Sequence, residues 1–431
     1  MSDRYLLFLA IILLGYSIFG KTFAKIGFPP LYIGELALLA GLYSIAKSNA
    51  IQNITKLKVN YVFIAFFLVG ISCTLPYITR YKVDALRDAA VWGYGLFAII
   101  LFCKIYERPS TLEYYIELYS KFVFIFLIIT PVVWLIVQLF YGGVSKLPSA
   151  GQKQLFYMKT PDVMVHLSGI TAFFVTGFAR FNKFYAVLLV LNIMLCAYST
   201  RAGMLTFMTS FGVLIIFNRD NIIVKRMVKI IILSLFLFWA SGISIKTERR
   251  EISFTQLKNN LVSAFTTSSD ESLDGTKLWR LLWWNEILNY TFFGEHFWQG
   301  KGFGINLAND DGFQVLEDDD SLRSPHNGHM TFLAREGVPG FMIWIALQLA
   351  WAGSVIASYR SSKRNGHRLW SNFFLFQLAY WSAFVVNASF DVYLEGPVGG
   401  IWFWTVFGVG LGAVYIYKFR VSNNNILNLK C

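Results

Sequence analysis

Residues 122–140 read FVFIFLIITPVVWLIVQLF and contain no charged side chain. A run of this length can cross the hydrocarbon core of a bilayer as an α-helix, which needs about 20 apolar residues. Similar runs recur along the chain, and 56% of its residues are hydrophobic while only 15% are charged. Soluble domains carry about 25% charged residues. The sequence therefore predicts an all-α polytopic membrane protein and argues against a soluble enzyme, a disordered chain or an outer-membrane barrel.

Twelve apolar segments are expected to form transmembrane helices within a single membrane domain over residues 1–431. They lie near residues 5–19, 29–47, 59–77, 90–104, 118–141, 162–180, 184–198, 203–217, 227–244, 338–358, 370–389 and 399–418. With the N-terminus inside, the short inner segments carry 19 Lys and Arg residues and the short outer segments carry 9. Basic residues mark cytoplasmic loops, so we expect both termini in the cytoplasm.

The formal net charge of +13 has the same explanation, so nucleic acid is not expected as a partner. The four cysteines, Cys73, Cys103, Cys196 and Cys431, show no C-x-x-C spacing, and neither a zinc site nor a disulfide framework is predicted. The predicted spans contain no internal repeat and few ionisable groups, Glu35 being the clearest exception. Both observations argue against a transporter.

The longest hydrophilic stretch, residues 245–337, follows the ninth predicted span and is expected on the outer face. It contains 13 acidic residues from Glu248 to Asp320, the sequence WRLLWWNEILNY and the glycine-rich run GKGFG. Loops that a rigid scaffold positions often carry function. We therefore expect this loop to form short interfacial helices and part of the active site.

The motif SPHNGHMTFLAREGVPG closes this loop. Asn327 is a good helix cap, so a short helix is expected from about this position until Gly337 and Pro339 break it. His326 would then lie at the rim of the bilayer, where a neutral imidazole can accept a proton from a hydroxyl group. A solvated loop histidine is the alternative. Gly337 and Gly340 would either let a helix or a lipid tail approach closely or simply break the helix.

Two arginines are expected at the same rim. Arg201, in STRAGMLTF, directly precedes the eighth span, and Arg280 lies on a predicted amphipathic helix whose residues Trp279, Trp283 and Ile287 recur at i, i+4 and i+8. A guanidinium group suits bidentate binding of phosphate. The alternatives are an interface anchor for Arg201 and a solvated side chain for Arg280.

Acidic residues precede the histidine motif: Asp310, Asp311, Glu317 and Asp318–Asp320. The DDD run contains the D-x-D spelling that some glycosyltransferases use for a metal and a nucleotide sugar, but three consecutive acids match it trivially. The spacing does not fit an EF-hand. A solvated charged loop is the expectation, and no metal site is predicted.

Taken together, these motifs resemble those of bacterial O-antigen ligases and the related surface-polysaccharide polymerases. The family signature H-[NSQ]-x9-G-x-x-G is similar to a stretch of this sequence. There, His326-Asn327 is followed after nine residues by Gly337 and after two more residues by Gly340. STRAG before a span, WRLLWW followed by GKGFG, and a long outer loop between the ninth and tenth of twelve spans are also similar. The motifs cover roughly residues 195–345.

The resemblance implies a metal-independent glycosyltransferase without a cofactor in the bacterial inner membrane, with its active site facing the periplasm. The donor would be a glycan on undecaprenyl diphosphate, and the acceptor a second glycan or the lipid A core. His326 takes the place of the essential histidine of the family, and Arg201 and Arg280 match the arginines assigned to the lipid diphosphate. Asn327, Gly337 and Gly340 would support the site. Membrane lipids and other polysaccharide-assembly proteins are candidate partners.

The acceptor separates two activities that share these motifs. A ligase attaches polymer to the lipid A core, whereas a polymerase joins one lipid-linked chain to another repeat unit. The negative charge of the acidic loop would repel a phosphate-rich acceptor, which slightly favours a polymerase. A flippase for lipid-linked glycans and a non-catalytic assembly scaffold are the competing classes. In a scaffold, His326, Arg201 and Arg280 would not need to converge on one reacting centre.

Overall fold

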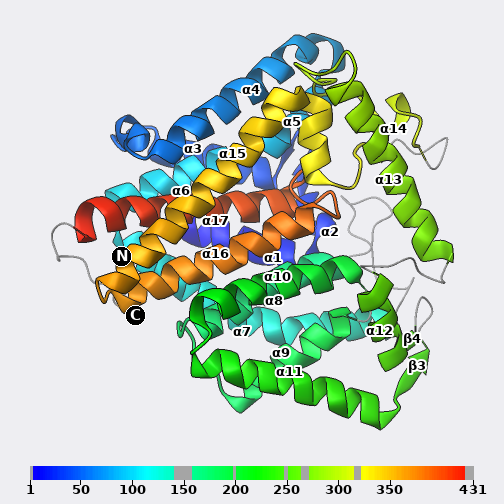
Figure 1. Cartoon of the computed structure of the whole chain (residues 1–431). Helices are drawn as coiled ribbons and strands as arrows, with labels where there is room; N and C mark the ends of the chain where they lie inside the picture. The colour runs from blue at the N-terminus through cyan, green and yellow to red at the C-terminus, as the bar shows by residue number, and fades with distance from the viewer. Residues whose placement is uncertain are drawn as a thin grey trace.

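The computed structural model describes residues 3–139, 158–197, 200–246, 251–263, 271–314 and 322–422. Most of these residues lie in α-helices that run roughly side by side (Figure 1). The first helices are α1 (Arg4–Phe19), α2 (Lys21–Ala24), α3 (Ile33–Ile45), α4 (Lys58–Tyr81), α5 (Val83–Gly93), α6 (Leu96–Glu107) and α7 (Ser110–Leu139). They are followed by α8 (Thr160–Val175), α9 (Lys183–Ala197), α10 (Arg201–Asn218) and α11 (Ile222–Ser241).

The remaining helices are α12 (Phe254–Ser263), α13 (Glu271–Phe292), α14 (Leu307–Asp310), α15 (Gly328–Arg364), α16 (Arg368–Ala388) and α17 (Pro397–Ile416). A 3-10 turn, η1 (Ile51–Lys56), precedes α4, and the π-helical turn η3 (Tyr417–Val421) follows α17. Two short antiparallel hairpins pair β1 (Gly27–Phe28) with β2 (Leu31–Tyr32) and β3 (Ser244–Lys246) with β4 (Glu251–Ser253).

A helix lies on each of the twelve predicted apolar segments. Within the described ranges, six helices are long and apolar enough to cross a membrane: α4, α7, α10, α15, α16 and α17. The pair α5 and α6 forms a seventh candidate bent by 43°, and α1, α3, α8 and α9 are shorter apolar helices. The all-α membrane class is therefore confirmed, while the number of twelve crossings stays a prediction.

Helix α17 lies at the centre of the bundle, where all its residues from Gly399 to Ile416 are buried. Its glycines let α6 approach closely. A Cβ atom on Gly408 would lie 2.5 Å from the Cα atom of Ala98, and one on Gly412 would lie 2.8 Å from the Cβ atom of Ile105. Small residues four apart are a common way for membrane helices to pack backbone against backbone.

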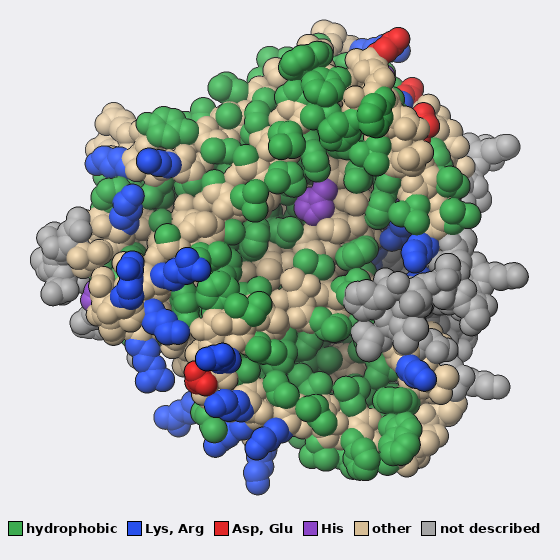
Figure 2. Space-filling model, in the orientation of Figure 1, with side chains coloured by type: hydrophobic (Ala, Val, Ile, Leu, Met, Phe, Trp, Pro, Cys, Tyr) green, Lys and Arg blue, Asp and Glu red, His purple; other side chains and the backbone are tan. Residues whose placement is uncertain are grey.

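The two ends of the described chain lie beside the same end of α6. Lys104 Nζ is 3.6 Å from Asp3 Oδ2, and Arg420 Nη2 donates to the carbonyl oxygen of Tyr106 at 2.8 Å. Both ends therefore share one side of the molecule, as an even number of crossings requires. Figure 2 shows that most lysines and arginines on this face gather at the end of the molecule opposite α13 and α14.

The long loop predicted over residues 245–337 contains β3, β4, α12, α13, α14 and the first turns of α15. The predicted aromatic stripe of α13 does not face outward. Trp283 and Ile287 are fully buried and pack with Leu333 at the start of α15. The exposed apolar side chains of this helix lie on its other face, at Leu278, Leu281, Leu282 and Phe292.

Candidate active site

The candidate site is built around the start of α15, where the predicted helix cap is confirmed. The Asn327 side-chain oxygen accepts hydrogen bonds from the backbone N–H groups of His329 and Met330 at 3.0 and 3.2 Å. These N–H groups have no partner inside the helix, which is why asparagine stabilises a helix start. The cap fixes the direction of the chain directly after His326.

Gly337 breaks this helix, as the sequence predicts. Its φ of 67° and ψ of −171° are non-helical, and the two helical parts of α15 meet there in a kink. A Cβ atom at this position would lie 2.4 Å from the carbonyl oxygen of Phe297. The next N–H group, on Val338, donates to the same Phe297 oxygen at 2.8 Å. The position therefore requires glycine both for its φ and for this close backbone approach.

The glycine-rich run GKGFG repairs the hydrogen bonding that the kink removes. In a regular helix, the carbonyl of Ala334 would accept from residue 338, and that of Arg335 from residue 339. The Val338 N–H group donates to the Phe297 carbonyl instead, and Pro339 has no N–H group. The N–H groups of Lys301 and Gly302 donate to these two carbonyls instead, at 2.7 and 3.0 Å. The three glycines of the run have φ values of 59°, 73° and 109°.

A buried ion cluster ties this loop to α5. Asp88 Oδ2 lies 3.0 Å from Arg335 Nη2 and 2.9 Å from Arg323 Nη2. The same carboxylate accepts from the N–H group of Gly304 at 3.2 Å. The carboxylate and both guanidinium groups are largely shielded from solvent, so removing one partner would leave a buried charge uncompensated. The cluster therefore fixes the loop against the kinked part of α15.

Within this frame, His326 faces a carboxylate. Its Nδ1 atom lies 3.5 Å from Asp391 Oδ1, an electrostatic contact rather than a well-formed hydrogen bond. Helix α13 supports the histidine from the other side. The Trp279 ring packs edge-on against the imidazole, with 6.1 Å between the ring centres, and Trp284 Nε1 donates to the Pro325 carbonyl at 2.8 Å. The His326 side chain is 28% exposed, so its ring remains accessible.

The backbone of His326 is also unusual, with a φ of 53°. A non-glycine residue in this region costs free energy and persists only where the surroundings hold it. Here the Asn327 cap on one side and the Pro325 contact with α13 on the other hold the conformation. The conformation places the imidazole beside the connection between α16 and α17.

Asp391 lies on that connection, where it faces both His326 and Lys159. Lys159 Nζ donates to both carboxylate oxygens at 3.0 and 2.8 Å, and the Val392 N–H group donates to Oδ1 at 2.8 Å. Burial favours the neutral acid, but His326 and Lys159 outweigh burial and hold the pKa of Asp391 well below its usual range. Asp391 is therefore a charged carboxylate at any ordinary pH.

The two predicted arginines are electrostatic neighbours at this site. Arg280 Nη1 donates to the carbonyl of Phe390 at 2.9 Å, one residue before Asp391. Burial lowers the pKa of Arg280, the Asp391 carboxylate opposes this shift, and the charge of Arg201 adds to it. Arg201 opens α10, where the Thr200 hydroxyl oxygen caps the helix. His326 and Arg280 thus lie beside Asp391, and Arg201 is an electrostatic neighbour of Arg280.

A second acid, Glu395, lies on the same connection. It is buried and accepts hydrogen bonds from the hydroxyl groups of Ser324 and Thr331. Burial raises the pKa of Glu395, and these hydrogen bonds together with the charges of Arg335 and His326 oppose the rise only in part. Glu395 therefore links the SPHN motif to the start of α17.

The predicted close approach at Gly340 involves α4. A Cβ atom on Gly340 would lie 3.2 Å from the Val69 side chain and would meet the Glu336 side chain of its own helix. Glycine thus lets the second part of α15 pack against α4 directly below the kink.

Other candidate groups have structural partners. Trp344 Nε1 donates to His329 Nδ1 at 3.0 Å, so His329 Nε2 carries the proton and donates to the Val385 carbonyl at 3.1 Å. The carboxylates of Asp310 and Asp311 accept from Lys301. Among the residues that the structure describes, no three His, Cys, Asp or Glu side chains form a metal-binding group. Glu317 and Asp318–Asp320 lie outside the described residues.

The sequence alone did not identify three members of the site: Asp391, Glu395 and Lys159. One signal was present, because Asp391 and Glu395 are the only acids after Glu336 in a long, mostly apolar sequence. Acids are costly in such a setting unless they are paired or functional. Nothing local to Lys159 distinguishes it from the other cations of the outer segments.

The fold and the site together define a class of protein. It is an all-helical membrane protein with a partly exposed histidine, a charged acid and two arginines at one end of the bundle. The model of the O-antigen ligase family matches residues 184–345. This stretch includes Arg201, Arg280 and the histidine motif, and it ends before the connection that carries Asp391. The match supports the resemblance: over these residues the chain is similar to the O-antigen ligase family, which supports a membrane O-antigen ligase or polymerase type of function. The curated proteins contain no match.

Proposed function

We propose that the protein transfers a glycan from undecaprenyl diphosphate to an acceptor sugar hydroxyl at the periplasmic face of the bacterial inner membrane. The placement of His326 and Arg280 beside Asp391, with Arg201 as an electrostatic neighbour of Arg280, carries this proposal. The family match supports it, because O-antigen ligases and polymerases use lipid-linked glycans and glycan acceptors in general. The basic end of the bundle would face the cytoplasm, and the loop over residues 245–337 would form part of the active site.

His326 acts as the general base. Because its Nδ1 atom faces the Asp391 carboxylate, Nδ1 carries the proton and Nε2 keeps the lone pair that accepts a proton from the acceptor hydroxyl. Asp391 is a positioning residue, since it orients the ring and stabilises the imidazolium that forms. The Asn327 cap and the Gly337 kink hold this geometry, and Gly340 seats the helix below it on α4.

Arg280 and Arg201 bind the diphosphate of the donor. As the acceptor oxygen attacks, the bond between the anomeric carbon and the phosphate oxygen breaks, and the electron pair leaves with the diphosphate. Two preorganised guanidinium groups stabilise that developing charge. The proton of the acceptor passes to His326 Nε2 and later to water. Attack from the face opposite the leaving group inverts the anomeric configuration.

The donor brings its own leaving group, so the proposed reaction uses no nucleotide sugar. The two arginines neutralise the charge of the leaving diphosphate, and no step of the proposed reaction uses a metal ion. The lipid tail would lie against the exposed apolar surface of the bundle while the diphosphate reaches the site at the rim.

The test is a gel of surface glycans from a strain that lacks this gene and receives wild type, His326→Ala or His367→Ala. His367 is the matched control, because its Nδ1 atom lies 3.2 Å from the Tyr417 hydroxyl at the other end of the bundle. We expect His367→Ala to restore the wild-type pattern and His326→Ala to fail although it is inserted. A bare core with accumulated lipid-linked polymer would identify a ligase, and a core with single repeats would identify a polymerase. Restoration by His326→Ala would refute the proposed base.

A further inference from the structure

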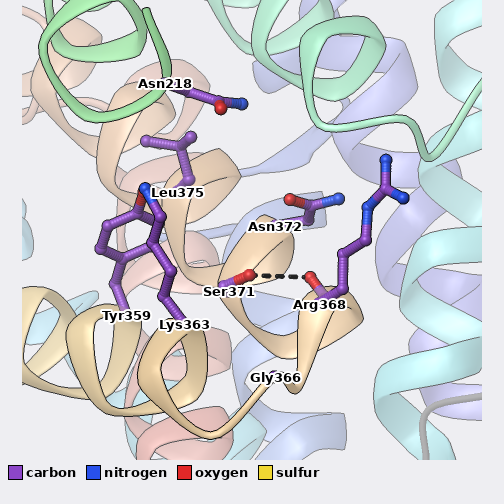
Figure 3. A pocket seen from close by; sticks show the side chains of 8 residues that line it. All are labelled: Asn218, Tyr359, Lys363, Gly366, Arg368, Ser371, Asn372 and Leu375. Atoms are coloured by element: carbon purple, nitrogen blue, oxygen red, sulfur yellow. Dashed lines mark hydrogen bonds between the residues drawn. The ribbon is translucent and has the colours of Figure 1, made fainter. Parts of the chain in front are cut away.

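A second polar pocket lies at the other end of the bundle, between the end of α10, the end of α15 and the start of α16. Figure 3 shows its lining, and its volume is about 250 Å³. Its lining includes Asn218, Tyr359, Lys363, Arg368, Ser371 and Asn372. None of them belongs to the proposed active site, and the family resemblance assigns them no role.

The pocket is lined by two cations and no acid. Lys363 Nζ lies 3.2 Å from the Tyr359 hydroxyl and 5.5 Å from the centre of its ring, which holds the ammonium group at the pocket wall. Among the described residues, no carboxylate forms an ion pair with Lys363 or Arg368. Asp220, the acid nearest in sequence to Asn218, lies 3.9 Å from Arg219 and 3.8 Å from Lys225.

The start of α16 adds to this positive potential. Arg368 is the first residue of this 21-residue helix, and its N-cap His367 contributes no side-chain hydrogen bond to the first turn. The first turn of a helix carries partial positive charge and unsatisfied N–H groups. Ser371 lies in the same turn, and its hydroxyl donates to the Arg368 carbonyl at 2.9 Å. Polar donors, two full cations and a helix start therefore surround one hollow.

We propose that this pocket binds a phosphate group. Lys363 and Arg368 would donate charge-assisted hydrogen bonds to its oxygens, and Asn372 and Ser371 would line the remaining wall. The phosphate would belong either to the headgroup of an anionic lipid in the adjacent leaflet or to a soluble phosphate compound. The site is independent of the proposed glycan transfer, because it lies at the opposite end of the bundle from His326.

The test measures binding to the purified full chain with two probes. One probe is inorganic phosphate added to the protein in detergent. The other is phosphatidylglycerol in nanodiscs, compared with nanodiscs of phosphatidylcholine alone. Stabilisation or direct binding by phosphate alone identifies a soluble ligand, and a response only to phosphatidylglycerol identifies a lipid headgroup. Either result supports the proposal, whereas a wild-type protein that responds to neither probe overturns it.

The variant pair Lys363→Gln/Arg368→Gln removes both cations. Each lost charge-assisted contact should weaken binding about tenfold, so the double variant should bind about 100-fold more weakly. Arg226→Gln/Lys229→Gln is the matched control, since both residues are cations of α11 that do not line the pocket. Lys363→Arg/Arg368→Lys keeps both charges and should keep binding, which separates charge from folding. Wild-type affinity in the double glutamine variant would refute the site.

Discussion

Replacing Asp391 by Asn tests whether this carboxylate positions the proposed base. The substitution keeps the size of the side chain and removes its charge. Unit charges 3.5 Å apart, the separation of His326 Nδ1 and Asp391 Oδ1, attract by roughly 5 kcal/mol at an effective dielectric constant of about 20. Lys159, which lies 2.8 Å from the same carboxylate, cancels a large share of this energy. We therefore expect the variant to lose about 1.5–3 kcal/mol of transition-state stabilisation, or about 10- to 100-fold in kcat.

The assay is turnover of a purified lipid-linked donor with its acceptor, measured over a range of donor concentrations. Because Arg280 and Arg201 remain in place, the KM for the donor should change little while kcat falls. Asp220→Asn is the matched control, since Asp220 lies beside Arg219 and Lys225, far from the site at the other end of the bundle. An Asp391→Asn variant with wild-type kcat, or one that raises KM alone, would show that the carboxylate does not act through His326.

Three further predictions follow from the same geometry. Arg280→Lys should lower kcat/KM for the donor about 10- to 100-fold, because lysine cannot bind a diphosphate in bidentate fashion; single-turnover kinetics with the lipid donor will measure this, and an unchanged value contradicts the role. Gly337→Ala should destabilise the protein by at least about 2 kcal/mol, because the left-handed φ alone costs about 1–2 kcal/mol and the Cβ atom would meet the Phe297 oxygen. Thermal unfolding measures this loss. The control is Gly353→Ala, where a Cβ atom meets open space. Because the pKa of Asp391 is lowered in the folded protein, the carboxylate contributes fully to stability above its unfolded pKa of about 4. This contribution is lost as the pH falls through the lower folded pKa. The free energies of unfolding of wild type and Asp391→Asn, measured by acid unfolding, should therefore converge only at strongly acidic pH.

The kink in α15 explains why a glycine-rich loop belongs to this site. Breaking the helix at Gly337 frees the carbonyls of Ala334 and Arg335, and Lys301 and Gly302 supply their donors. Losing this loop would leave buried carbonyls without partners, which is costly in the interior of a membrane protein. The loop and the histidine motif are thus one structural unit.

The amino-acid sequence by itself determined the class of the protein and the local features of the site. Apolar runs long enough to span a bilayer become helices wherever they occur, because a helix satisfies its backbone hydrogen bonds within the segment. The helix cap at Asn327 and the break at Gly337 and Pro339 are local as well, since each depends on the residue's own side chain or φ angle. The histidine and arginine motifs were recognisable from their spacing.

Only the tertiary structure decided which residues meet at the site and which faces they present. Asp391 and Lys159 are 232 positions apart, and neither stands in a recognisable motif. The stripe on α13 has the spacing of an amphipathic helix, but spacing does not say whether protein or lipid covers the apolar face; here Trp283 and Ile287 pack on α15. Local propensity acts over a few residues, whereas the partners of His326 depend on how α13 and the connection between α16 and α17 pack around the start of α15.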